Sequence, residues 1–166
     1  MRKILTATLA AASLAAGVAQ AATTTTTFAV TATVLSTCSA TAVPLAFPNY
    51  TPGGGPQLGS TTISVKCTNN TPFTVLLNAG STTGDAFAQR LMASGANTLQ
   101  YNLYTSAALT TVFGDGTLGS ATVAGTGLGV ATAAGVQVFG QLPDSATNQA
   151  AVAGSYSDLI TVTVSY

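Results

Sequence analysis

The sequence predicts an all-β protein folded as a β-sandwich. Apolar side chains recur at every second residue in several short segments, as expected for strands that bury one face. Gly, Pro, Asn and Asp cluster between these segments, where turns are expected. Frequent Thr, Val and Gly lower the helix propensity of the chain. A helical turn is expected only in residues 86–92.

The first 21 residues have the features of a secretory signal peptide. Arg2 and Lys3 precede an apolar run that covers residues 4–16, and residues 19–21 offer a small-x-small cleavage site. The run is shorter than the ~20 residues that cross a bilayer, so we expect no membrane anchor. Removal of 21 of the 166 residues leaves 145, which is the length of one domain.

Residues 22–34 are predicted to form an N-terminal extension with the character of a strand. Five threonines are followed by apolar side chains on every second residue, namely Phe28, Val30, Ala32 and Val34. The periodicity leaves two alternatives open. The segment either forms the first edge strand of its own sandwich or completes a sheet in another molecule.

Two cysteines, Cys38 and Cys67, lie in the mature chain. Because a signal peptide directs them to an oxidising compartment, we expect one intramolecular disulfide, with two free buried thiols as the alternative. Closing a loop of about 30 residues stabilises a fold by roughly 3 to 4 kcal/mol in the chain-entropy model. The spacing excludes a CxxC redox site.

Strands and loops are expected to alternate through the middle of the chain. Residues 43–47 form a short apolar piece broken by Pro44, which indicates an edge or a strand start. Residues 48–59 contain three prolines and four glycines, which predicts a loop. Further loops are expected between the later strands and at residues 143–154. The predicted strands are residues 61–67, 73–78, 99–104, 110–113 and 136–142, with a weak strand around Val123.

The last eleven residues, 156–166, carry the strongest strand pattern of the chain. Polar residues separate the apolar side chains of Ile160, Val162, Val164 and Tyr166. If this strand lies inside a sheet, no later segment covers its far side. The fold would then be one strand short.

Several segments, in this order along the chain, resemble the spore coat protein U domain family, which includes pilins of the archaic chaperone-usher pathway. They are FAVTATV before Cys38, LAFPNYTP, TTISVKC, LQYNLYT, TVFGDGT, VFGQLP and AGSYSDLITVTVSY. The resemblance covers essentially the whole mature chain. It implies an incomplete immunoglobulin-like β-sandwich that lacks its last strand and is completed by donor-strand exchange, with residues 35–166 as the pilin domain.

The resemblance also implies roles and partners. The donor strand for a neighbour's groove would consist of Phe28, Val30, Ala32 and Val34. The acceptor groove, which also pairs with the chaperone, would be lined by Ile160, Val162, Val164 and Tyr166. Cys38 and Cys67 would bridge the first two strands. The implied partners are neighbouring copies or related pilins, a periplasmic chaperone and an outer-membrane usher.

The composition argues against catalysis. The sequence has no histidine, glutamate or tryptophan, which removes most general bases and metal ligands. Lys66 lies in an alternating strand, where we expect it to face solvent and not to activate a serine. No metal site and no small-molecule cofactor are expected. The four aspartates lie in turn contexts and are expected to be solvated turn residues: Asp85, Asp115, Asp144 and Asp158.

The charge of the mature chain is low. The mature chain has two cations, Lys66 and Arg90, and four aspartates, which gives a net charge of minus two. Two cations do not make a basic patch, so nucleic acid is not an expected partner.

Together these features predict a pilus subunit that a chaperone-usher pathway secretes to the periplasm and then to the cell surface. It would polymerise by donor-strand complementation into fibres for adhesion and biofilm formation. One alternative is a secreted spore-coat or surface-layer structural protein that is not assembled into a pilus. Another is a small adhesive binding module, although 145 residues leave no room for a separate binding domain.

Overall fold

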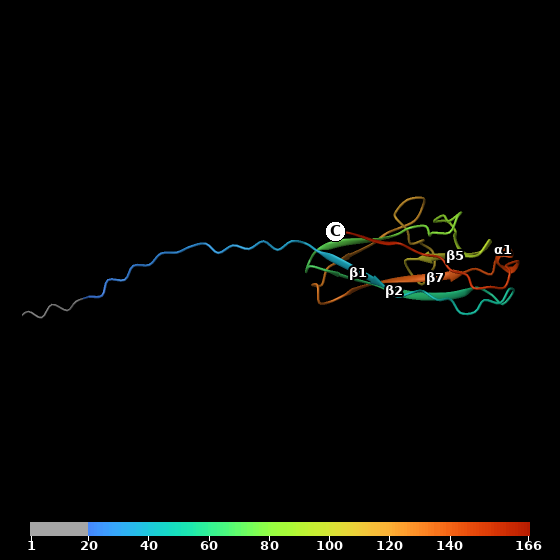
Figure 1. Cartoon of the computed structure of the whole chain (residues 1–166), viewed down its shortest axis with the longest axis horizontal. Helices are drawn as coiled ribbons and strands as arrows, with labels where there is room; N and C mark the ends of the chain where they lie inside the picture. Colours follow the sequence, from blue (N-terminus) through green and yellow to red (C-terminus); the bar gives the residue numbers. More distant parts are fainter. Residues whose placement is uncertain (1–19) are drawn as a thin grey trace, which may run out of the picture. The chain divides into compact units, whose positions relative to one another are not determined.

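The computed structural model describes residues 20–166 (Figure 1). The predicted signal peptide lies almost entirely outside the described residues. The chain divides into two units between Thr33 and Val34. The described part of the first unit, residues 20–33, has no helix or strand. None of the described helices is long and apolar enough to cross a membrane.

The second unit contains two antiparallel sheets, which confirms the prediction of an all-β fold. The five-stranded sheet has the order β1-β2-β7-β5-β4 and the three-stranded sheet has the order β6-β3-β8. A short helix, α1 (Ala146–Gln149), lies in the predicted loop before the last strand. The strands are β1 (Cys38–Ala42), β2 (Gln57–Cys67), β3 (Pro72–Leu77), β4 (Arg90–Ser94), β5 (Asn97–Tyr104), β6 (Val123–Thr126), β7 (Ala134–Leu142) and β8 (Val162–Ser165).

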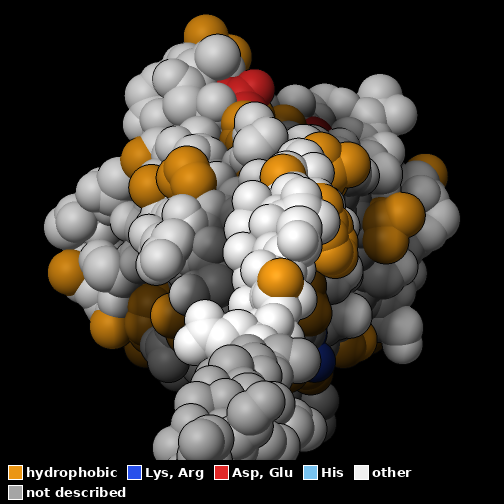
Figure 2. Space-filling view, turned by 90° about the vertical axis from the view of Figure 1, so that its left-hand side faces the viewer, with side chains coloured by type: hydrophobic (Ala, Val, Ile, Leu, Met, Phe, Trp, Pro, Cys, Tyr) orange, Lys and Arg blue, Asp and Glu red, His pale blue; other side chains and the backbone are white. Residues whose placement is uncertain are grey.

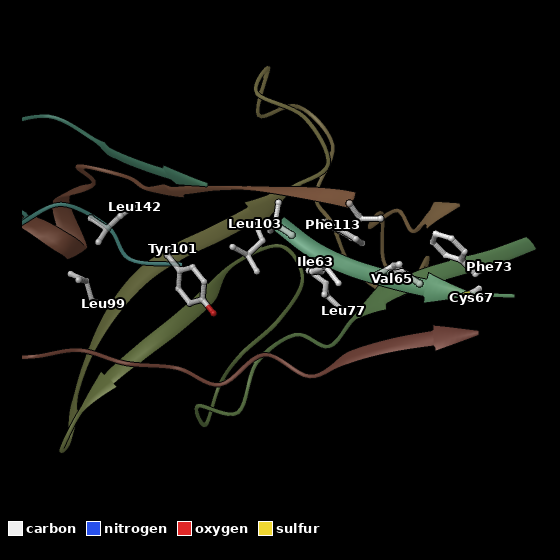
Figure 3. Close-up of a cluster of buried hydrophobic side chains, with 13 residues drawn as sticks. Ile63, Val65, Cys67, Phe73, Leu77, Leu99, Tyr101, Leu103, Phe113 and Leu142 are labelled. Carbon is white, nitrogen blue, oxygen red and sulfur yellow. The ribbon is translucent and has the colours of Figure 1, made fainter. Parts of the chain in front are cut away.

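The core lies between the sheets and follows the period of two in the sequence (Figure 3). In β2 the buried residues are Ile63, Val65 and Cys67, and the residues between them are more exposed. β3 shows the same alternation, which places Val75 and Leu77 against the other sheet. Because each strand buries alternate side chains, the sequence pattern was sufficient to identify this core.

The disulfide joins Cys38, the first residue of β1, to Cys67, the last residue of β2. These two residues lie directly opposite each other in the antiparallel pair. The predicted pairing is therefore confirmed, and the alternative of two free thiols is wrong. The bond fixes a five-residue edge strand to a longer strand inside the sheet.

The helical turn expected in residues 86–92 is wrong, because Arg90–Ser94 forms β4, paired with β5. The physical reason is the burial of Arg90, whose guanidinium donates to the carbonyl oxygens of Asn78 (2.8 Å) and Phe113 (2.7 Å). It also donates to Oδ1 of Asn102 at 2.7 Å. These partners are far away in the sequence, so local propensity does not report them.

Residues 43–47 form no strand but pack on β2 and β7 at a place where both strands have a glycine. Gly59 of β2 and Gly140 of β7 are opposite each other in the sheet. A Cβ atom on either glycine would lie within 3.0 Å of a Leu45 side-chain carbon. A Cβ on Gly140 would also come to 2.9 Å from the ring of Phe47. Because the paired glycines have no side chains, Leu45 and Phe47 can pack directly on the backbone of the two strands.

Charged groups contribute little to the surface. In the space-filling view of Figure 2 most of the visible face is polar side chain or backbone, with hydrophobic side chains in separate patches and few charges.

The predicted strand at residues 110–113 is reduced to isolated bridges, in which Val112 pairs with Tyr104 and Phe113 pairs with Ala121.

Candidate interaction groove

The last segment of the chain forms one wall of an apolar groove. Side chains along residues 156–165 alternate between half-buried and exposed, so that Ile160, Val162 and Val164 face the core. Only β8 of this segment lies in the three-stranded sheet, where it is an edge strand beside β3. The predicted alternation is correct, but regular pairing covers fewer residues than the pattern suggested, because Ser157 instead bridges to Ala93 of β4 in the other sheet.

The free edge of β8 carries unpaired backbone groups. The N–H of Asn78 donates to the carbonyl oxygen of Thr161 at 3.1 Å, and Leu76 is opposite Thr163 in the same ladder. Hydrogen-bonded pairs alternate in an antiparallel ladder, so the N–H and C=O groups of Val162 and Val164 point away from β3. Within residues 20–166 no strand pairs with that edge. An edge of this kind can accept a strand from another molecule.

A groove of about 380 Å³ lies beside this edge. Ile160 and Val162 line the groove together with residues 42–45 and Phe47, a segment that begins at the end of β1. Val164 packs against the core but does not line the groove. The hollow is therefore confined to the part of the wall that precedes Val164. Its floor consists mainly of apolar side chains from both sheets, including Ile63, Leu77, Leu103 and Val138, the first three of which are labelled in Figure 3.

One end of the groove is polar. The Tyr101 hydroxyl donates to Oδ2 of Asp158 at 2.6 Å, and the N–H and hydroxyl of Ser81 donate to Oδ1 of Asp158 at 2.9 Å. Partial burial raises the pKa of Asp158, but these hydrogen bonds outweigh it and hold the pKa below its usual value. Burial, followed by the bond to Asp158, raises the pKa of Tyr101. Asp158 therefore anchors the wall in its ionised form.

A second carboxylate lies close to Asp158. A Cβ atom on Gly80 would clash with Oδ2 of both Asp85 and Asp158, so the two carboxylates meet at this glycine. Burial raises the pKa of Asp85, and the nearby charge of Asp158 adds to the effect. Burial also lowers the pKa of Arg90, although the neighbouring acidic groups oppose this shift. The expectation that these aspartates are merely solvated turn residues is wrong.

The other two aspartates also hold loops in place. Asp144 accepts hydrogen bonds from the hydroxyl of Tyr50 and from the N–H groups of Gly53 and Gly55. Asp115 accepts from the N–H and hydroxyl of Thr117. Among residues 20–166 no three Asp, Glu, His or Cys side chains gather in the manner of a metal site.

The predicted donor residues lie in a segment without regular structure. Residues 20–37 form no strand, so the role of this segment as a donor strand or as a first edge strand stays a prediction. The side chains of Phe28 and Val30 are 87% and 84% exposed. Ala32 and Val34 are exposed as well. These four side chains have apolar surface that no part of the described chain buries.

The structure places the predicted acceptor residues unequally. Ile160 and Val162 line the groove, Val164 is half-buried and packs against the core beyond it, and Tyr166 is 60% exposed. Sequence reasoning missed the floor residues Leu77, Leu103 and Tyr101 as parts of a site. Their alternation predicts burial in a strand, and no sequence signal distinguishes a filled core position from one beside a hollow.

Comparison with known proteins identifies the type of domain. The family model of the Spore Coat Protein U domain matches residues 24–163. The fold is similar to a chain in the crystal structure of the CsuC–CsuE chaperone–tip adhesion subunit pre-assembly complex from archaic chaperone-usher Csu pili of Acinetobacter baumannii, with a TM-score of 0.55 and 22% sequence identity. The match covers 81% of the present chain and 41% of that chain. A search of curated proteins found no match. The similarity confirms the predicted immunoglobulin-like class of sandwich.

Proposed function

The chain belongs to the Spore Coat Protein U domain family, and we propose that it is the structural subunit of a surface pilus assembled by donor-strand complementation. In this proposal the extension of one copy enters the groove of the next copy and pairs with the free edge of β8. A periplasmic chaperone occupies the edge first, and an outer-membrane usher directs the exchange. The fibre serves adhesion and biofilm formation at the cell surface.

One observation carries the proposal: the same chain has an open strand edge beside an apolar groove and an exposed apolar segment of strand period. The edge is that of β8, and the groove has a volume of about 380 Å³. The segment presents Phe28 and Val30, each more than four-fifths exposed. Buried backbone groups need partners and exposed apolar side chains favour burial, so the two features are complementary. Because both occur in every copy, they favour assembly with other copies.

The expected energy is sufficient for a long-lived fibre. Burying a Phe or Val side chain contributes about 1.5 to 3 kcal/mol. Phe28, Val30 and Val34 each offer such a side chain, and the edge of β8 adds backbone hydrogen bonds of about 0.5 to 1.5 kcal/mol each. A strand held by many small contacts leaves only when most of them break together, which makes dissociation slow.

The direction of the donor strand decides between a fibre and a closed dimer. β1 begins at Cys38, at the same end of the domain where β8 ends, since Cys67 precedes β3 and Thr74 of β3 is opposite Ser165. When the donor strand runs antiparallel to β8 of the next copy, the domain that follows the donor lies at the other end of that copy, where β8 begins. Each contact is then head-to-tail and leaves the next extension free, which gives an open fibre. A parallel donor would bring two like ends together and permit a closed pair.

The proposal is tested by gel migration of material sheared from cells. We expect a ladder of oligomers without heating that collapses to monomer on boiling, because heat releases the donor strand. The alternative function is that of a secreted coat component that does not polymerise in this way. A chaperone-independent monomer without any ladder would overturn the proposal and favour that alternative.

A deletion and a rearrangement test the roles of the two ends. Without residues 23–34 the subunit should remain folded with its chaperone and cap fibres without extending them. Moving residues 23–34 behind Tyr166 through a short flexible linker should give a self-complemented monomer, since β8 ends where an antiparallel donor begins. The matched control carries Val30→Asp in the moved segment and should lose the added stability. Unfolding of the deleted subunit alongside its chaperone would show that the segment belongs to its own domain.

A further inference from the structure

The shape of the groove fixes the register of the donor strand, and this inference rests on the proposed function. We infer that in the assembled protein Phe28 of one copy lies opposite Val162 of the next, with Val30 opposite Ile160 and Ala32 opposite Asp158. The occupant is thus the extension of a second copy, in one alignment only. Residues directly opposite each other in an antiparallel pair point to the same face, so all six side chains face inward.

The hollow requires the largest donor side chains beside Ile160 and Val162. Both residues line the groove, together with Ile63, Leu77 and Leu103 on the floor. Phe28 is the largest of the alternating apolar side chains in the extension. Opposite Val162 its ring enters this space, and Val30 fills the adjoining part next to Ile160. Interiors tolerate few voids, so this filling is favoured.

A shift of the donor by two residues in one direction would leave the hollow underfilled. Phe28 would then lie opposite Val164, which does not line the groove. The core beside Val164 is already closed, since Val75, directly opposite it in the ladder, is fully buried. Ala32 would be left beside Ile160, where its single methyl group fills little of the space. Overpacking of Phe28 at Val164 and a void beside Ile160 would both destabilise the complex of donor and groove.

A shift in the opposite direction would press Val30 against Asp158. The Asp158 carboxylate accepts from Tyr101 and Ser81 and lines the polar end of the groove. A branched apolar side chain over this carboxylate would remove its remaining contact with water without supplying a donor, which costs free energy. Ala32 is small enough to pass over it. The register therefore explains why the donor has an alanine at this position.

Engineered disulfides in fibres of the full chain read the register directly. Residues 161 and 159 face away from the core, and opposite them in the inferred register lie Ala29 and Thr31. These are pairs without mutual hydrogen bonds, because the backbone groups of Val162 point toward the donor, and their Cα atoms are expected about 4.5 Å apart. A disulfide needs Cα atoms within about 4.4 to 6.8 Å, whereas a slip of two residues separates them by about 7 to 8 Å.

The experiment pairs Thr31→Cys with one second cysteine at a time on the same chain. The four second substitutions are S157C, L159C, T161C and T163C, all at exposed positions. We expect a ladder that survives boiling without reductant for the Leu159→Cys pair and only background for the others. A surviving ladder at residue 157 or 161 would show a register shifted by two residues, and one at residue 163 would show a shift of four residues or a parallel donor; each would overturn the inference. If T31C/L159C fails to assemble, A29C/T161C tests the same alignment against a shift of the antiparallel register.

The wild-type gel separates this inference from the function on which it rests. A heat-sensitive ladder without any boiling-resistant ladder at the Leu159 or Thr161 pairs would overturn the register and leave the pilus assignment intact. No ladder at all in unboiled wild-type material would instead overturn the proposed function. As a second readout, Ala32→Leu should reduce the amount of fibre, whereas Ala29→Leu, on the outward face, should not. Equal assembly of these two variants would also contradict the inferred register.

Discussion

Removal of the disulfide tests how the domain holds its first strand. Replacing both Cys38 and Cys67 by serine opens a loop closed by residues 29 apart in the sequence. In the chain-entropy model, a loop of this length corresponds to roughly 3.6 kcal/mol of stability at 25 °C. The effect should be strong because β1 has five residues and pairs only with β2. In the proposed fibre the extension continues into the domain at this strand, so a pull on the joint between two copies would reach β1 first.

Urea unfolding of the self-complemented monomer measures this effect without the complication of assembly. With an m-value of about 2 kcal/mol/M, the midpoint should fall by just under 2 M in the double variant. The matched control is Ser39→Ala in β1, which keeps the disulfide and should leave the midpoint nearly unchanged. A loss below about 1 kcal/mol for the double variant would refute the reasoning, because it would mean that strand pairing alone holds β1 in place.

Three further predictions concern the interior and the loops. Arg90→Met should lower the free energy of unfolding by about 3 kcal/mol or more, since three acceptors lose their donor and two of these hydrogen bonds are buried. Arg90→Lys should recover only part of this stability, and an unchanged urea midpoint would contradict the burial argument. Gly140→Ala should cost about 1 to 3 kcal/mol by displacing Leu45 and Phe47 from the strands, and calorimetry of the self-complemented monomer should show a lower Tm. The hydrogen bond from Tyr50, followed by those from the N–H groups of Gly53 and Gly55, lowers the pKa of Asp144. The ionised Asp144 carboxylate therefore stabilises the fold above its unfolded pKa of about 3.9, and this stabilisation is lost as pH falls through the folded pKa. Amide exchange at Gly53 and Gly55 should therefore accelerate in acid, and Tyr50 should titrate near pH 12, since burial and Asp144 raise its pKa to about 12; equal protection of both amides at pH 2 and pH 6 would disprove this role.

The elements that the sequence predicted correctly are those whose period repeats over many residues. β2, β3, β5 and β7 all lie where alternation places them, and the pair Cys38–Cys67 was expected from two cysteines in a chain with a predicted signal peptide. The errors occur where a distant partner overrides local preference. β4 is a strand because the Arg90 guanidinium reaches carbonyl groups on other segments, and residues 43–47 lie flat because two glycines from different strands meet beneath them.

The candidate site divides in the same way. Alternation along residues 28–34 and 160–166 shows which side chains share a face, because a strand has a fixed period of two. It does not show which strand edges remain free. That depends on which strands pair, and pairing joins residues that are far apart in the sequence.

By itself, the sequence determined an all-β domain, its buried faces, its disulfide and two apolar ends that match each other. Only the tertiary structure decided that residues 20–37 form no strand, that β8 has a free edge and that a hollow lies beside Ile160 and Val162. The polar end formed by Asp158 and Tyr101 also depends on the fold. The physical reason is that side-chain periodicity is a local property, whereas an unpaired edge and an unfilled volume result from the packing of the whole domain.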